Sequence, residues 1–116
     1  MIWLWTSAIL MAITAVIHSV AGEKRLIMPA LAIGKGVLAV PFARKVLRGA
    51  WHLTSLFMLL TAAVMVWPRT DAGLKGFVAA AWLVMGLYSL MSSRGKHIGW
   101  PTLTLAGVAG LLGSMI

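Results

Sequence analysis

Residues 3–21, WLWTSAILMAITAVIHSVA, are the stretch that decides the fold class. The stretch contains no Asp, Glu, Lys or Arg, and as a helix it is long enough to cross a hydrocarbon layer of about 30 Å. Three further stretches have the same apolar character, at residues 50–67, 74–91 and 98–116. The sequence therefore predicts an all-α integral membrane protein, a four-helix bundle that forms a single transmembrane domain over residues 1–116.

The composition agrees with lipid as the solvent. Of the 116 residues, 61% are hydrophobic and only 10% are charged, which leaves too little polar surface to cover a soluble core of this size. In a membrane protein, the net charge of +8 favours anionic lipids as partners and does not indicate nucleic acid. The chain has no cysteine, so a bound metal or haem would need histidine and oxygen ligands.

Residues 26–47 are apolar, but they contain Pro29, Pro41 and a lysine, Lys35, between two glycines. A lysine in that setting would be costly at the centre of a bilayer. We therefore expect an interfacial amphipathic segment between helices 1 and 2 and not a fifth span. Pro41 suits the first turn of a helix that can run directly into the second span. The side chains expected to contact lipid headgroups along it are Arg44, Lys45 and Arg48.

Positive charges are distributed unevenly between the two sides of the predicted bundle. Only Arg69 and Lys75 lie on the side of the loop between the second and third spans. An excess of Lys and Arg marks cytoplasmic loops, so the long loop 22–49 is expected in the cytoplasm and both termini outside, as in a bacterial inner membrane. The eight cations on the predicted cytoplasmic side are Lys24, Arg25, Lys35, Arg44, Lys45, Arg48, Arg94 and Lys96.

The three histidines fall at nearly the same depth in this threading. His18 and His52 each lie about one helical turn from the cytoplasmic end of a span, and His97 lies at the start of the fourth span. Glu23 is the only acidic residue on that side. Three imidazoles and a carboxylate can bind a transition metal ion, and His18 with His52 could clamp haem b. The predicted metal or haem ligands are therefore His18, His52, His97 and Glu23.

Other polar side chains are expected at the same level, where they could orient the imidazoles. On the second span, Arg48, His52 and Ser55 are spaced four and three residues apart and share one helical stripe. The predicted supporting residues are Arg48, Ser55, Tyr88 and Ser92.

Two other functions could use the same residues. One is a small homo-oligomeric transporter or channel in which the histidines exchange protons or bind cargo. The other is a membrane enzyme or accessory subunit that acts on lipid headgroups, with His18 or His52 as the base. The outer half of the spans has few polar residues, which disfavours a monomeric channel, and no H-E-x-x-H, G-x-S-x-G or phosphate-loop motif points to an enzyme.

Small residues recur at four-residue spacing in the fourth span, as in Ala106-x-x-x-Gly110 and Ala109-x-x-x-Gly113. Such ridges allow helices to approach closely, either inside one chain or between copies of a homo-oligomer.

Overall fold

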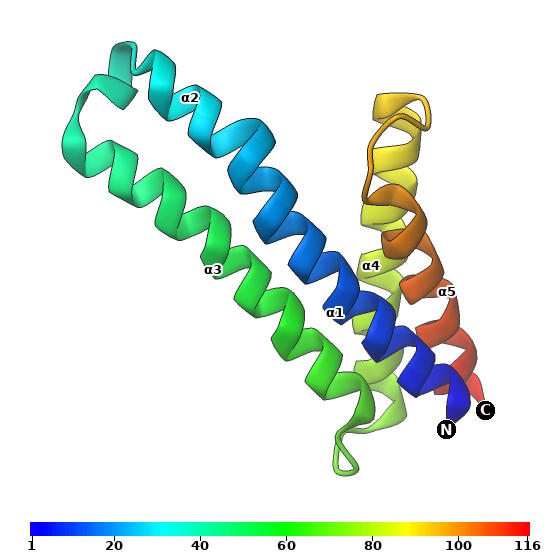
Figure 1. Ribbon diagram of the computed structural model, residues 1–116. Coiled ribbons are helices and arrows are strands. Elements are labelled where there is room, and N and C mark those ends of the chain that lie inside the picture. Colours follow the sequence, from blue (N-terminus) through cyan, green and yellow to red (C-terminus); the bar gives the residue numbers. More distant parts are fainter.

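The computed structural model describes all residues, 1–116, and consists of helices joined by short turns (Figure 1). The first hairpin is formed by α1 (Ile2–Gly22), the π-helical turn η1 (Glu23–Ile27), α2 (Met28–Ile33), the 3-10 turn η2 (Gly36–Ala39) and α3 (Pro41–Val66). The second hairpin is formed by α4 (Ala72–Ser93) and α5 (Trp100–Met115). The predicted all-α class is thus confirmed, with α1, η1 and α2 running on as one long helix.

The two hairpins pack together at one end and diverge at the other (Figure 1). α1 lies between α3 and α5, and α4 packs along α5. Both termini and the α3–α4 turn lie at the closed end, whereas η1, α2 and the α4–α5 turn lie at the open end. The buried core occupies the closed part and consists of Leu4, Ala8, Met11, Ala62, Met65, Ala79, Trp82, Leu103 and Ala106.

The first helix does not end at residue 21, where the first predicted span ends. Gly22 costs a helix only about 1 kcal/mol, and the Glu, Lys and Arg that follow it are good helix formers. The helix therefore continues, and in η1 the Met28 N–H bonds to the Glu23 carbonyl across a wide π turn. This turn carries the chain to Pro29, which has no N–H to donate. The long helix ends at Gly34, whose φ of 58° lies in the left-handed region.

Residues 26–47 accordingly form the outer part of a helical hairpin and not a separate segment between two helices. Pro41 begins α3, as the sequence predicts, and α3 runs without interruption into the second predicted span. The turn between the two helices is held by Arg44, whose guanidinium Nη1 donates to the carbonyls of Leu31 at 2.7 Å and Leu38 at 3.2 Å.

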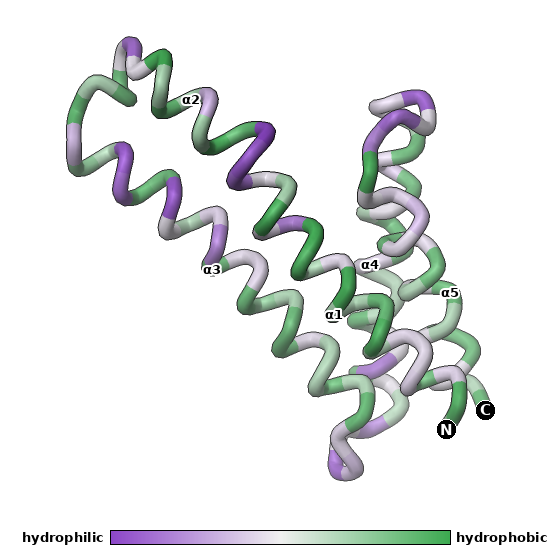
Figure 2. The backbone as a smooth tube through the Cα atoms, viewed as in Figure 1, coloured by the Kyte–Doolittle hydropathy of each residue, from purple (hydrophilic) through white to green (hydrophobic).

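Three helices are long and apolar enough to cross a membrane, namely Ile2–Ile33, Pro41–Val66 and Ala72–Ser93. α5 has only 16 residues, or about 24 Å at 1.5 Å per residue, so the fourth predicted span is not confirmed. Only 20 of 116 residues are buried, and hydrophobic residues follow the helices over most of their length (Figure 2). This exposed apolar surface indicates a membrane protein.

Small residues bring α4 and α5 close together. A Cβ added to Gly107 would lie 2.5 Å from the backbone nitrogen of Leu83, and one added to Gly110 would lie 2.7 Å from the Ala79 Cβ. The small-residue ridge of α5 therefore packs inside the chain, which is one of the two uses that its spacing allows.

Candidate functional site

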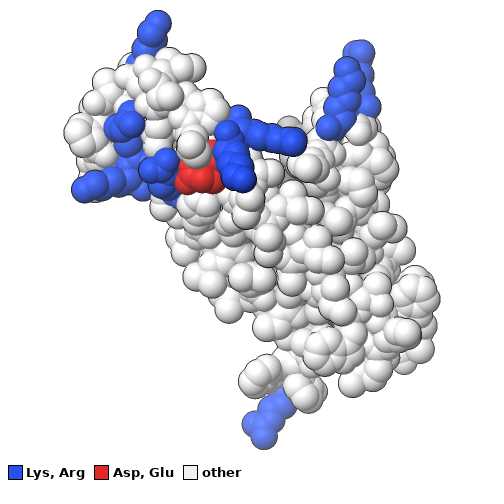
Figure 3. Space-filling model, viewed as in Figure 1, with Lys and Arg blue, Asp and Glu red and all other residues white.

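Charged side chains gather at the open end of the molecule (Figure 3). Lys and Arg side chains surround a single acidic patch there, and few charges appear at the end with the termini. Glu23 makes the only two ion pairs in the structure, to Arg48 and to His52. The other cations at this end therefore carry positive charge that no carboxylate compensates.

A chain of side-chain hydrogen bonds joins α1 to α3 at this end. The His18 Nδ1 lies 2.7 Å from the Ser55 Oγ, and the Ser55 Oγ lies 2.7 Å from the Ser19 Oγ. The Ser19 Oγ in turn lies 3.0 Å from the His52 Nδ1. We call these four residues the relay. Its two imidazoles come from different helices and are joined through two hydroxyl groups.

The carboxylate of Glu23 lies next to the His52 end of the relay. The His52 Nε2 lies 3.1 Å from the Glu23 Oε1. Arg48 donates two hydrogen bonds to the same carboxylate, at 2.9 and 3.2 Å, in a bidentate pair. The side chain of Glu23 is 24% exposed and that of His52 is 37% exposed, so this end of the relay reaches water.

Helical spacing explains why these side chains meet. On the first helix, Ser19 and Glu23 are four residues apart and face α3. On α3, the spacing of four and three residues between Arg48, His52 and Ser55 makes the matching stripe. The sequence predicted the second stripe but missed Ser19, although its distance of four residues from Glu23 was a usable signal.

Trp51 fixes the orientation of the His18 ring. The two rings are stacked, with centroids 4.1 Å apart and planes inclined by 6°. The indole Nε1 also donates a hydrogen bond of 2.8 Å to the His18 carbonyl. Gly22 provides the space, because a Cβ at that position would overlap the indole. With its Nδ1 held by Ser55, His18 keeps an Nε2 that makes no hydrogen bond.

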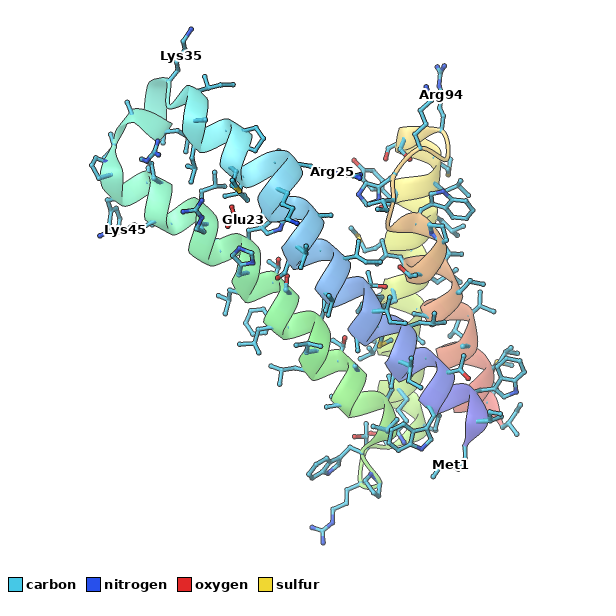
Figure 4. All side chains as sticks on the ribbon, in the orientation of Figure 1. Met1, Glu23, Arg25, Lys35, Lys45 and Arg94 are labelled. Carbon is cyan, nitrogen blue, oxygen red and sulfur yellow. The ribbon has the colours of Figure 1, made fainter.

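A cavity of about 320 Å³ lies beside His18, between the first helix and the turn that leads into α5. Arg25, Lys96 and His97 line it together with His18. Glu23 and Arg25 are two residues apart, which is close to half a helical turn, so their side chains point to opposite sides of the helix. Figure 4 shows this division, with Glu23 between the two helices of the first hairpin and Arg25 on the side toward α4 and α5.

Several predicted site residues lie outside the relay. His97 lines the cavity, and its Nδ1 accepts a hydrogen bond of 3.1 Å from the Gly99 N–H. Tyr88 is 65% exposed on α4, and Ser92 is also exposed. The structure gives neither of these two side chains a hydrogen bond to the relay.

The predicted headgroup cations have three different roles. Arg44 holds the turn of the hairpin, and Arg48 is paired with Glu23. Lys45 alone projects freely, from the outer side of α3 (Figure 4). The cations next to the cavity are instead Arg25 and Lys96, which the sequence did not single out.

The four predicted metal or haem ligands do not come together as a metal site. No three His, Cys, Asp or Glu side chains gather closely enough to hold a metal ion. The two ring nitrogens of His52 are engaged by Ser19 and Glu23, so His18 and His52 do not offer two free nitrogens to one haem iron. Protein-family models, curated proteins and solved structures were compared with this chain, and none of them matches it.

Proposed function

We propose that this membrane protein exchanges a proton between a molecule bound beside His18 and the water at the Lys/Arg-rich end. The observation that carries the proposal is the unbroken relay from His18 to His52. Imidazoles and hydroxyl groups can both donate and accept, so the relay can pass a proton when each hydrogen bond reverses its direction. In the threading predicted from the positive charges, this water is the cytoplasm.

The carboxylate sets the first of two proton arrangements. An ionised Glu23 can only accept, so the Nε2 of His52 must carry a hydrogen. When His52 is neutral, its Nδ1 accepts from Ser19, Ser19 accepts from Ser55, and Ser55 accepts from the Nδ1–H of His18. The Nε2 of His18 then holds a lone pair and can act as a base toward a molecule in the cavity.

Uptake of a proton by His18 produces the second arrangement. The His18 Nδ1 proton passes to Ser55, the Ser55 proton passes to Ser19, and the Ser19 proton passes to the His52 Nδ1. Ser19 then donates to Ser55, the reverse of the first arrangement. His52 becomes an imidazolium ion against Glu23, where its exposure allows it to release a proton to water. The positive charge has thus moved from the cavity to the surface.

This proton exchange takes place on one side of the membrane only. The relay ends at His18, and the buried hydroxyl groups beyond it, those of Thr14 and Ser7, donate to the backbone carbonyls of Leu10 and Ala106. Because these hydroxyl groups bond to backbone carbonyls and not to one another, no chain of side-chain hydrogen bonds continues from the relay through the core, and the arrangement favours acid–base chemistry or proton-coupled binding over conduction across the bilayer.

Replacing Ser55 with alanine is expected to uncouple the two imidazoles, because it removes the hydroxyl group between His18 and Ser19. In protein with ¹⁵N-labelled histidine, reconstituted in bilayers, NMR should show the ring hydrogen of His18 changing from Nδ1 to Nε2 over the same pH range in which His52 becomes imidazolium. In Ser55→Ala the two rings should change independently.

Thr54→Ala is the matched control for this experiment. The Thr54 hydroxyl lies one residue away but bonds only to the Trp51 carbonyl, so the coupling should survive its loss. Protonation of His52 without a change of tautomer at His18 in the unmodified protein would contradict the proposal. Stoichiometric metal or a Soret absorption band in the purified protein would replace it with the metal or haem function.

A further inference from the structure

We infer that the cavity beside His18 binds an amphiphile whose head is a phosphate monoester. The inference rests on the proposed function for the fate of the proton, but the binding itself depends only on the cavity. Along the first helix the cavity runs from Thr14 to Leu26, about 18 Å at 1.5 Å per residue. Its inner part is lined by Ile17, Met58 and Leu103.

The outer part of the cavity is cationic. Arg25 from η1 and Lys96 from the α4–α5 turn both line it, and neither makes an ion pair within the chain. A guanidinium group binds phosphate through two parallel hydrogen bonds, and an ammonium group adds a point charge. A head held there by both cations, with its tail toward the core, would have the orientation of a lipid in that leaflet. It would also bridge the two hairpins where they diverge.

Charge and proton chemistry together favour a phosphate monoester. At pH 7 it carries a charge of about −1.5 to −2, which matches two cations, and its second pKa is about 6. Histidine has an ordinary pKa of about 6.5, and proton transfer is most effective between groups of similar pKa. A phosphodiester or a sulfate has the anionic oxygens but no proton to give in this range.

The proton step on this ligand follows from the relay. The O–H bond of the phosphate monoanion breaks, a bond forms between that proton and the His18 Nε2, and the relay delivers one proton to the His52 Nδ1. The dianion remains between Arg25 and Lys96, and no electron transfer is involved. His18 faces Arg25, Lys96 and His97 across the cavity and Ser55 and Trp51 on α3. Positive charge around the cavity opposes an imidazolium at His18 and favours the dianion, so it drives the proton toward His52 and Glu23.

Isothermal titration calorimetry of the detergent-solubilised full chain tests the binding, with octyl phosphate as the probe. Octyl sulfate keeps the tail and one fixed charge, and we expect it to bind at least about tenfold more weakly. Inorganic phosphate keeps the head alone and should show no saturable binding in the same range. Equal binding of octyl sulfate would overturn the monoester, and equal binding of inorganic phosphate would overturn the amphiphile.

Paired charge variants test the location of the site. Arg25→Gln with Lys96→Gln should weaken octyl phosphate binding on the order of a hundredfold, because two charge-assisted hydrogen-bonding groups are lost. Lys35→Gln with Lys45→Gln changes the net charge by the same amount at positions away from the cavity lining. This second pair should leave affinity within about threefold. Equal losses in both pairs would show attraction by overall charge and would overturn the site.

The proton step has a separate readout. At constant pH, octyl phosphate should raise the imidazolium fraction of His52 in ¹⁵N spectra of the unmodified protein and of Thr54→Ala, but not of Ser55→Ala. Binding without this conversion would leave the phosphate site standing and remove the proposed function. Coupled histidines without binding would remove the site and leave the proposed function.

Discussion

Replacing Gly107 with alanine is expected to lower the free energy of unfolding by about 3 kcal/mol, because the added methyl group would collide with backbone. The new Cβ would lie 2.5 Å from the nitrogen and 2.7 Å from the Cα of Leu83. Neither atom is the end of a flexible side chain, so α4 and α5 must move apart along their contact. Thermal unfolding in detergent, followed by circular dichroism, measures the loss.

Gly49 provides the matched control for this substitution. It lies inside α3 with nothing within 4 Å of an added Cβ, so Gly49→Ala introduces no collision. Alanine is favoured over glycine in a helix by about 1 kcal/mol, so this variant should be slightly more stable than the unmodified chain. The same chemical change should thus have opposite signs at two positions, and a loss of similar size at both would contradict the packing of α4 against α5.

The sequence predicts the small-residue ridge of α5 but not its partner. A four-residue spacing of Gly and Ala shows that one face of a helix carries only small side chains. It does not show which helix packs against that face. The structure packs Gly110 against Ala79 on α4 and Ser7 on α1, and Gly113 against Leu4 on α1. Gly107, which lies outside the predicted spacing, packs against Leu83 on α4. The fate of residues 22–33 was equally hidden, because a glycine followed by charged residues resembles the end of a span. Helix propensity permits the continuation, and the contacts of Glu23 with Arg48 and His52 on α3, which the sequence does not show, add to it.

The sequence predicts how far along each helix the residues of the candidate site lie, but not which way their side chains point. Distance along a helix follows from the rise per residue, so the common level of His18, His52 and Glu23 could be derived from the sequence. The rotation of each helix about its axis depends on packing between helices. For that reason the sequence placed His97 with the other histidines, whereas the structure places it across the cavity from the relay. For the same reason the sequence does not show that Arg25, two residues from Glu23 and on the opposite side of the helix, faces the cavity.

Replacing Glu23 with glutamine is expected to abolish delivery of the proton to His52, because the charge that stabilises the imidazolium disappears. Glutamine keeps the size of the side chain and one oxygen that can accept from Arg48 or His52, so the hairpin should still fold. In ¹⁵N spectra at constant pH, octyl phosphate should not raise the imidazolium fraction of His52 in Glu23→Gln. The affinity of Glu23→Gln for octyl phosphate should stay within about threefold of that of the unmodified protein, because Arg25 and Lys96 are unchanged. Glu23→Ala removes both acceptors, and faster amide hydrogen exchange is then expected across η1 and the start of α3.

Asp71, the other acidic residue of the chain, separates the effect of Glu23 from a change in net charge. It caps α4 by accepting a hydrogen bond of 2.9 Å from the Leu74 N–H, at the end of the molecule away from the relay. Asparagine caps helices about as well as aspartate, so Asp71→Asn removes one negative charge at little cost in stability. His52 should still become imidazolium when ligand binds to this variant. If ligand binding failed to protonate His52 in both Asp71→Asn and Glu23→Gln, the long-range electric field of the protein would govern the protonation of His52. If His52 became imidazolium in both variants, the contact between Glu23 and His52 would have no part in holding the proton. The water-facing end of the relay would then have to lie elsewhere.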